Sequence, residues 1–161
     1  MDSLNQHILE YRKQLIKGDI QKAYRGIMSF MLGLRSDLEN KYPEHVLGTI
    51  YYGYMDMTYF AFTPSGLKNK GLKIAIVYLH EKGTFEIWLA ANNRKIQADY
   101  INILNKREVR EYKVSAVSPG VDSIVQAVLV AQPDFDAPEG LKMQIEMATM
   151  SFTKDIISLF E

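Results

Sequence analysis

The amino-acid sequence predicts an α+β fold in which helices pack on a mixed sheet of about four strands, in the order α-α-β-β-β-α-β-α-α. Two observations carry this prediction. Residues 20–41 repeat apolar side chains at intervals of three and four, which is the period of a packed helix. Residues 72–90 show an apolar strand, a tight turn and a second strand, and a capped helix follows. A length of 161 residues suits one globular domain, over residues 1–161.

Composition limits the classes of function. Hydrophobic residues make up 47% and charged residues 24% of the chain, as in ordinary globular proteins. Lys plus Arg and Asp plus Glu each total 19, and this balance argues against general nucleic-acid binding. The absence of cysteine excludes disulfides and thiolate chemistry. The N-terminus has no signal-peptide pattern and no apolar run reaches membrane-spanning length, so we expect a cytoplasmic protein with no membrane partner.

Two helices are expected in the N-terminal quarter of the chain. Ser3 and Gln6 form a capping box for a first helix over residues 3–17, which Gly18 ends. The apolar positions of that helix are Leu4, Ile8, Tyr11 and Leu15. The second helix covers about 20–41, and its apolar seam is Ile20, Tyr24, Ile27, Met31, Leu34 and Leu38. We expect this seam to pack on the sheet or on the first helix.

An aromatic segment follows at residues 49–62, with the sequence TIYYGYMDMTYFAF. It predicts one long strand, or two short strands bent at Gly53. Asp56 then places a carboxylate in an otherwise apolar strand, which singles it out as a candidate site residue.

A hairpin is expected at residues 72–90. Residues 72–79 form a near-continuous apolar run, which is typical of a central strand covered on both faces. A turn near Gly83 leads into a strand over 84–90, where alternation puts Glu86 and Trp88 on the same face.

The C-terminal half predicts further helices and one more strand. Asn92 or Asn93 caps a helix that runs to about Lys106, and 112–117 can form a fourth strand. Residues 123–132 are ambiguous, because their β-branched side chains favour a strand whereas the flanking Asp122 and Pro133 favour a capped helix. We assign a helix, with a strand as the alternative. Pro138 begins a closing helix.

The best candidate site lies around the strand over 84–90. The chain has no phosphate loop, dinucleotide turn or nucleophile elbow, and its three histidines do not stand at metal-ligand spacing. We therefore expect no cofactor and no metal. The candidate ligand-binding residues are Tyr52, Tyr54, His80, Trp88, Asn93 and Arg94. Aromatic walls with a few polar groups are typical of small-ligand sites.

Glu86 needs a partner if it is buried in this strand. Arg94 follows eight residues later, and an arginine can hold a carboxylate in a bidentate pair. We expect the two to pair, or to share a polar cluster, at the carboxyl end of the strand. The alternative is that Arg94 is solvated and only flanks the helix cap.

The order of elements over about residues 20–117 resembles the core of the restriction-endonuclease-like nucleases. That resemblance implies an acidic residue on the second core strand and a Glu-x-Lys motif on the third, with the carboxylates holding Mg²⁺. Here Glu86-Ile87-Trp88 stands in the motif's place, and Asp56 lies one strand early. Asp56 and Glu86 are thus the candidate catalytic carboxylates of a divergent metal-dependent hydrolase, which we expect to be inactive as a nuclease.

Three segments resemble an uncharacterised bacterial family, a domain of unknown function. They are GYMDMTYF at 53–60, LKIAIVYLHEKGTFEIWLAANNRKIQ at 72–97 and PDFD at 133–136. The resemblance implies a small bacterial cytoplasmic protein and no known activity. We therefore interpret the chain as a non-catalytic ligand-binding or interaction module, whose partner is a small molecule or a protein. The hydrolase remains the alternative.

Overall fold

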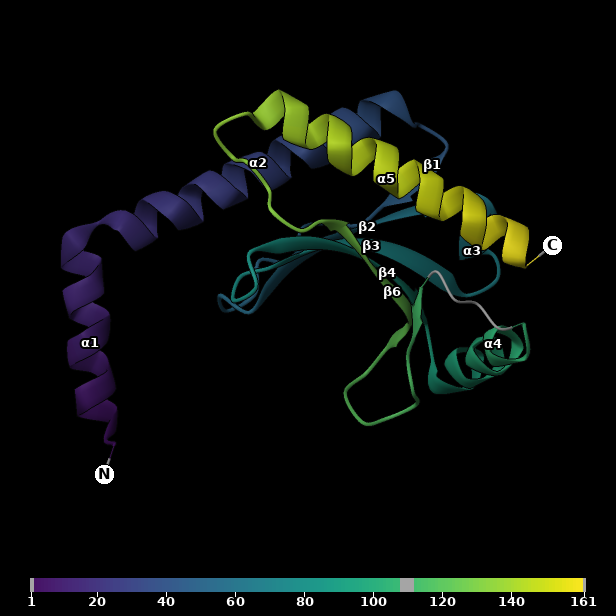
Figure 1. Cartoon of the computed structure of the whole chain (residues 1–161), viewed down its shortest axis with the longest axis horizontal. Helices are drawn as coiled ribbons and strands as arrows, with labels where there is room; N and C mark the ends of the chain where they lie inside the picture. Colours follow the sequence, from purple (N-terminus) through teal and green to yellow (C-terminus); the bar gives the residue numbers. More distant parts are fainter. Residues whose placement is uncertain (1, 108–111, 161) are drawn as a thin grey trace.

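The computed structural model describes residues 2–107 and 112–160. Its helices are α1 (Leu4–Lys17), α2 (Asp19–Lys41), α3 (Ser65–Lys68), α4 (Arg94–Lys106) and α5 (Pro138–Leu159). Its strands are β1 (His45–Leu47), β2 (Met57–Pro64), β3 (Leu72–Leu79), β4 (Thr84–Ala91), β5 (Lys113–Val114) and β6 (Ser123–Val130). Figure 1 shows the helices arranged around one curved sheet.

The sheet has six strands within the described residues, in the order β1-β2-β3-β4-β6-β5. Each pairing is antiparallel, so the expected mixed sheet of about four strands is wrong in both direction and number. The two extra strands are the short edge strand β1 and strand β6, whereas the fourth strand expected over 112–117 is present as the two-residue strand β5. The element order becomes α-α-β-β-α-β-β-α-β-β-α, because the turn-rich connection after β2 contains the short helix α3.

Residues 123–132 do not form the helix that we assign from the sequence. Residues 123–130 form strand β6, which pairs with β4 through Val125 opposite Leu89 and Val130 opposite Phe85. The pairing satisfies the backbone groups of β4 on that side, and the β-branched side chains suit a pleated surface. These non-local bonds outweigh the local capping signals of Asp122 and Pro133.

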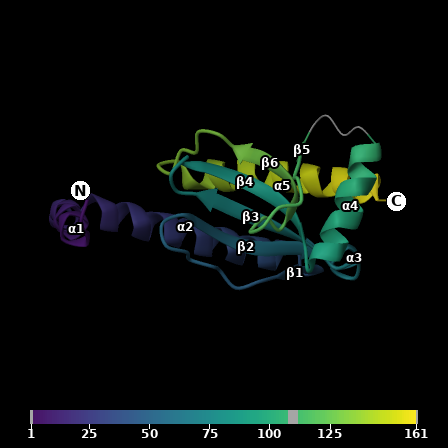
Figure 2. The same ribbon diagram turned by 90° about the horizontal axis from the view of Figure 1, so that it is seen from below.

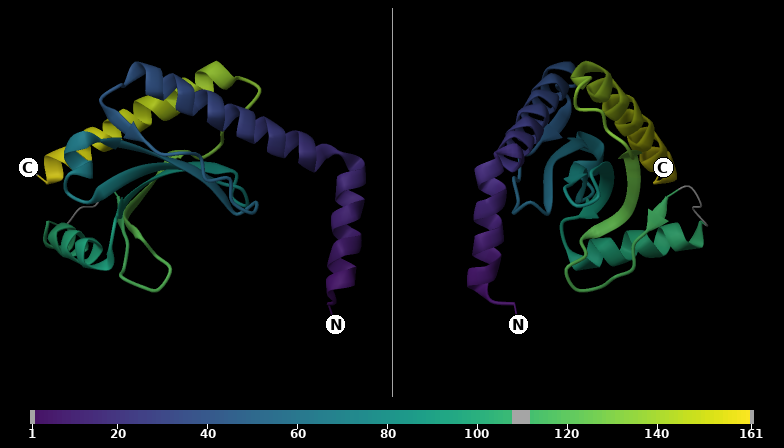
Figure 3. Two further views of the ribbon diagram at one scale, coloured as in Figure 1. Left: turned by 180° about the vertical axis from the view of Figure 1, so that it is seen from behind. Right: turned by 60° about the vertical axis from the view of Figure 1, so that its left-hand side comes forward.

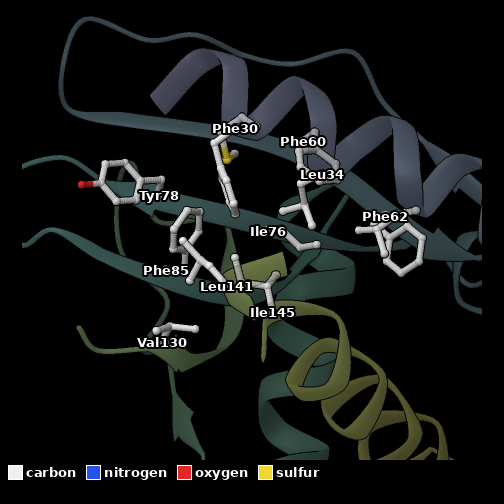
Figure 4. Packing of buried hydrophobic residues seen from close by; sticks show 12 residues of the cluster. Phe30, Leu34, Phe60, Phe62, Ile76, Tyr78, Phe85, Val130, Leu141 and Ile145 are labelled. Atoms are coloured by element: carbon white, nitrogen blue, oxygen red, sulfur yellow. The ribbon is translucent and has the colours of Figure 1, made fainter. Parts of the chain in front are cut away.

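One face of the sheet is covered by α2 and α5, which run at an angle to each other across it (Figures 1 and 3). The core between these layers, drawn in Figure 4, contains Phe30, Met31, Leu34, Leu38, Phe60, Phe62, Ile76, Tyr78, Phe85, Val130, Leu141 and Ile145. The second half of the predicted α2 seam is thus confirmed as core. The first half is not, because Ile20 is exposed and Tyr24 stacks on His80 at a ring-centroid distance of 6.0 Å.

A second core cluster lies at the other end of the sheet, where α4 and the last turns of α5 meet the strands. Its buried members are Leu67, Leu72, Ile74, Ile87, Leu89, Ala91, Ile101, Leu104, Ile124, Val125, Phe152 and Ile156. The predicted cap of α4 is confirmed, because the Asn93 side chain accepts a hydrogen bond from the Ile96 amide at 2.9 Å.

Helix α1 stands clear of the sheet in each view (Figures 1 and 3). The predicted capping box is confirmed, since the Ser3 hydroxyl accepts from the Gln6 amide and the Gln6 side chain accepts from the Ser3 amide. Gly18 ends the helix with φ +83°, in the left-handed region that glycine adopts without strain. No residue of α1 is buried.

The second face of the sheet is open. Figure 2 looks onto it from below, with β2, β3, β4 and β6 in front of α2 and α5 and with α4 crossing one end. Among the described residues, the helices are too short or too polar to span a membrane.

Candidate functional site

The open face of the sheet holds a hollow of about 430 Å³ over its central strands. Antiparallel register aligns Ala75 of β3 with Trp88 of β4 and Gln126 of β6, so these three side chains share the open face. The lining residues are Tyr51, Met57, Tyr59, Lys73, Ala75, Val77, Trp88, Ala90, Gly120, Val121, Asp122, Ser123 and Gln126. The small side chains of Ala75, in the middle of β3, and Ala90, near the end of β4, leave the space that larger side chains surround.

Aromatic side chains form one part of this hollow. The segment before β2 forms an antiparallel bridge with it, and the Tyr51 and Tyr59 rings lie with centroids 5.0 Å apart. Trp88, the one tryptophan of the chain, is half-buried, and its indole N–H donates to Glu86 Oε1 at 2.9 Å. This bond fixes the plane of the indole against the sheet.

Polar side chains line another part of the hollow. Gln126 Nε2 donates to Ser123 Oγ at 2.8 Å, and Ser115 Oγ lies 2.8 Å from the same hydroxyl oxygen. Lys73 begins the row of open-face residues on β3, and within the described residues its ammonium has no ion pair or hydrogen bond. The hollow therefore joins flat apolar surfaces to one unpaired cation and a few hydrogen-bonding groups.

Glu86 and Arg94 do not form the expected pair. Glu86 lies on the open face near the start of β4, where it accepts from Trp88 and has Lys82 Nζ at 3.9 Å. Arg94 follows the opposite end of β4 and donates to the Ser118 and Val121 carbonyl oxygens. The length of the strand separates the two charges. The alternative, that Arg94 is solvated and only flanks the helix cap, is not observed either. Its hydrogen bonds hold in place the segment before β6, which lines the hollow.

Asp56 has a local structural role. Its Oδ1 accepts from the Tyr54 amide at 2.9 Å, and such backbone hydrogen bonds lower the pKa of its carboxyl. Gly53, at φ +75°, belongs to the same turn, and a Cβ there would lie 2.0 Å from the Met57 carbonyl oxygen. The tight turn explains why β2 begins at Met57 and does not include the whole expected strand over 49–62.

His80 is fixed beside this turn. The Thr58 hydroxyl lies 2.7 Å from the Tyr52 carbonyl oxygen and 2.8 Å from His80 Nε2. Since a carbonyl can only accept, the hydroxyl proton points to Tyr52, and His80 Nε2–H donates to the hydroxyl oxygen. Burial lowers the pKa of His80, with the Asp56 charge opposing it. The arrangement is a neutral, structural histidine and not a base aimed at a nucleophile.

The two candidate carboxylates, Asp56 and Glu86, are not brought together. Met57, which follows Asp56, pairs with Leu79, and Leu79 pairs with Thr84 on the strand of Glu86. The two residues thus stand two strand spacings apart, or roughly 10 Å, and are also offset along the strands. One cation needs all its oxygen ligands within about 2.6 Å. Within the described residues, no cluster of three or more histidines and carboxylates suits a metal ion.

Of the residues singled out from the sequence, Trp88 lines the hollow. Tyr52 and Tyr54 are exposed in the segment before β2, while Asn93 and Arg94 line an adjoining recess with Lys73. Sequence reasoning missed Tyr51, Tyr59, Lys73, Ser123 and Gln126. The alternation of side chains along β3 is a signal in the sequence for this face. Lys73, Ala75 and Val77 share one face of the strand, and a face covered by other elements would not be expected to begin with a lysine.

Comparison with known proteins gives one match. A family model described as a domain of unknown function, DUF7000, matches residues 4–160. No curated protein and no solved structure matches the chain.

Proposed function

Because the chain belongs to DUF7000, a family of unknown function, we propose from its geometry that it is a non-catalytic binding module for a small molecule. The ligand is a flat, largely apolar ring system that carries an acidic group. It lies in the hollow on the open face of the sheet, with its ring against Trp88 and the tyrosines and its acid toward Lys73.

The observation that supports this proposal is the joining of aromatic surfaces and an unpaired ammonium in one hollow. A volume of about 430 Å³ falls in the usual range for small-ligand sites. Trp88, Tyr51 and Tyr59 offer faces and edges on which a ring gains more than burial alone. Lys73 can pair with an anion, and Gln126 and Ser123 can orient it by hydrogen bonds.

The chemistry of the lining favours binding over catalysis. Covalent and acid–base catalysis use a nucleophile within hydrogen-bond reach of a base. Ser123 is the hydroxyl nearest to such a role, and its partners among the described residues are Gln126 and Ser115, which are not bases at neutral pH. Asp56, in the turn before β2, and His80, directly after β3, could act as bases, but neither lines the hollow.

A matched pair of probes tests the proposal. 2-Naphthoate and 2-naphthamide share a ring system and differ in charge, so their binding separates the contribution of the ring from that of the acid. The chain has one tryptophan, so the single indole N–H signal in a proton–nitrogen NMR spectrum reports binding at Trp88. We expect both probes to shift this signal, and the naphthoate to bind more tightly.

Lys73→Met should weaken naphthoate binding by up to about fivefold and leave the naphthamide unchanged, because an exposed ion pair contributes up to about 1 kcal/mol. Lys95→Met, at an exposed lysine of α4 outside the hollow, is the control and should change neither. Equal effects of the two lysine variants, or an unshifted Trp88 signal at millimolar probe in protein whose open sheet face is free, would contradict the proposed site.

A further inference from the structure

Helix α1 contributes no buried side chain to either core cluster of the protein. It has 14 residues, and isolated helices of that length are marginal in water. Large apolar side chains nevertheless face solvent along it, with Leu4 at 74% and Ile16 at 82% exposure. The caps at Ser3 and Gly18 help to hold the helix, but they do not cover these side chains.

The apolar surface of α1 is wide. At 100° per residue, Leu4, Ile8, Tyr11 and Leu15 fall within about 60° of one another around the helix. Leu9 and Ile16 extend the same surface to an arc of about 160°. A two-helix seam needs only the narrow stripe, whereas a helix that packs on a sheet uses a wider arc.

The corner between α1 and α2 keeps this arc off the chain's own sheet. The Leu15 carbonyl oxygen accepts from the Gly18 amide at 3.1 Å and from Gln21 Nε2 at 2.7 Å. Helix α1 therefore projects at a steep angle from α2, toward the open face of the sheet, on which α4 crosses only one end (Figures 1 and 3).

The open sheet face matches α1 in size and chemistry. A helix of 14 residues is about 21 Å long, and strands of eight residues are about 26 Å long. Antiparallel sheets that face water usually present polar residues there, whereas this face centres on the half-buried Trp88, with Ala75 and Val77 buried at the floor of the hollow. Val128 on β6 adds an apolar side chain that is 59% exposed.

Charge also permits the two surfaces to meet between copies. The chain has a formal net charge of zero, and a protein near zero net charge has little long-range repulsion from its own copies. Arg12 interrupts the apolar arc of α1. The open face offers it a carboxylate in Asp122, whose side chain is 77% exposed at the edge of the hollow and lies 3.9 Å from its nearest cation, Arg94.

We infer that the protein forms a two-fold symmetric dimer in which α1 of each copy packs its apolar arc on the open sheet face of the other. Each copy donates its α1 to the other, so two helix-on-sheet contacts form at once. The total buried surface is therefore twice that of a single short helix, and closer to the roughly 1,200 Å² that a stable interface buries. The docked helix occupies the face proposed for the small ligand, so dimer and ligand compete. The dimer itself does not depend on a ligand.

The mass of the whole chain in solution tests the inference. Analytical ultracentrifugation across a concentration series should give a dimer for the wild type. Tyr11→Lys places a charge in the arc and should weaken the dimer by about 30-fold or more, as at an interface hot spot. Gln14→Lys ends in the same residue on the polar side of α1 and should leave the dimer intact. Neither position is buried, so neither change threatens the fold.

A second pair of variants locates the docking surface. Val128→Lys on the open face should break the dimer, and Met143→Lys, at an equally exposed residue of α5 on the far side of the sheet, should not. Dilution of the wild type should shift the Trp88 fluorescence to the red as the open face meets water. The Tyr11→Lys variant should show no such shift.

Three results overturn the inference: a wild type that is monomeric throughout, a dimer that survives both Tyr11→Lys and Val128→Lys, or a dimer that depends on Tyr11 alone with no change at Trp88. The last would indicate pairing of α1 with α1. Failure of the ligand proposal shows itself separately, as absent 2-naphthoate binding to the monomeric Tyr11→Lys variant.

Discussion

Two histidines are held neutral by burial. His45 stacks on Phe62 with ring centroids 4.3 Å apart, and 6% of its side chain is exposed. Among the residues that the structure describes, its ring nitrogens have no hydrogen-bond partner, although Glu44 Oε1 lies 3.4 Å from Nδ1, a contact that is electrostatic in nature. Burial lowers the pKa of His45, and Glu44 opposes this only in part. Burial acts in the same direction on His80.

These histidines should make stability depend on pH. Because the folded pKa of His45 lies below its unfolded value of about 6.5, the unfolded chain binds more protons as the pH falls through this region. The free energy of unfolding should therefore decrease as the pH is lowered below about 6.5. His45→Phe should reduce the loss between pH 7.5 and pH 5, as measured by urea denaturation. His7→Phe, on exposed α1, is the control, and equal pH dependence in the two variants would be inconsistent with this account.

Gly53 should tolerate alanine less well than Gly18. Both have positive φ, which strains a side chain by about 1–2 kcal/mol. At Gly53 a Cβ would also meet the Met57 carbonyl oxygen at 2.0 Å, whereas at Gly18 nothing lies within 4 Å. Thermal melting should show a larger loss for Gly53→Ala than for Gly18→Ala. A loss of the same size at both sites would mean that the turn before β2 opens without penalty.

At the scale of elements, polar contacts align α2 with α5. Glu146 of α5 accepts from Lys41 Nζ at 2.6 Å and from the Tyr42 hydroxyl at 2.8 Å. Burial alone would raise the pKa of Glu146, but these hydrogen bonds outweigh it and hold the pKa below its ordinary value. Lys142 of α5 reaches back to Asp37 of α2 at 3.0 Å. These pairs fix the register of the two helices above the apolar core.

The core face of α2 yields a stability prediction. Leu34 is 1% exposed within the first cluster, and Ile20, on the same predicted seam, is 36% exposed. Leu34→Ala should lower the free energy of unfolding by roughly 2–5 kcal/mol, because it leaves a cavity in a packed layer. Ile20→Ala should lower it by less than about 1 kcal/mol. Chemical denaturation measures both, and a loss below about 1 kcal/mol at Leu34 would refute the assigned core face.

The elements that the sequence predicts well are those whose signals are local. The cap at Ser3, the cap at Asn93 and the hairpin through Gly83 each depend on residues a few positions apart. Strand β6 depends on pairing with β4, more than thirty residues earlier, and its local caps point to a helix. Because of that one error, the sequence analysis missed Ser123 and Gln126, which are the residues that β6 contributes to the hollow.

At the scale of the molecule, two long helices cover one face of the sheet, whereas on the other face only α4 crosses one end (Figure 2). Helices α2 and α5 cover the first face, while α1, which has an apolar arc of its own, stands away from the second (Figures 1 and 2). Both the ligand proposal and the dimer concern that open face. Its residues come from strands spread along the sequence, so periodicity within a single segment could not reveal it.

The place of α5 in the chain has a consequence for synthesis on the ribosome. This helix supplies Leu141 and Ile145 to one core cluster and Phe152 and Ile156 to the other, and it follows all the strands. While residues 1–137 emerge, the sheet can pair its hairpins, but the apolar side chains beneath α5 stay in water. A nascent chain of this length therefore exposes apolar surface until α5 has emerged, and during that interval it depends most on protection by chaperones.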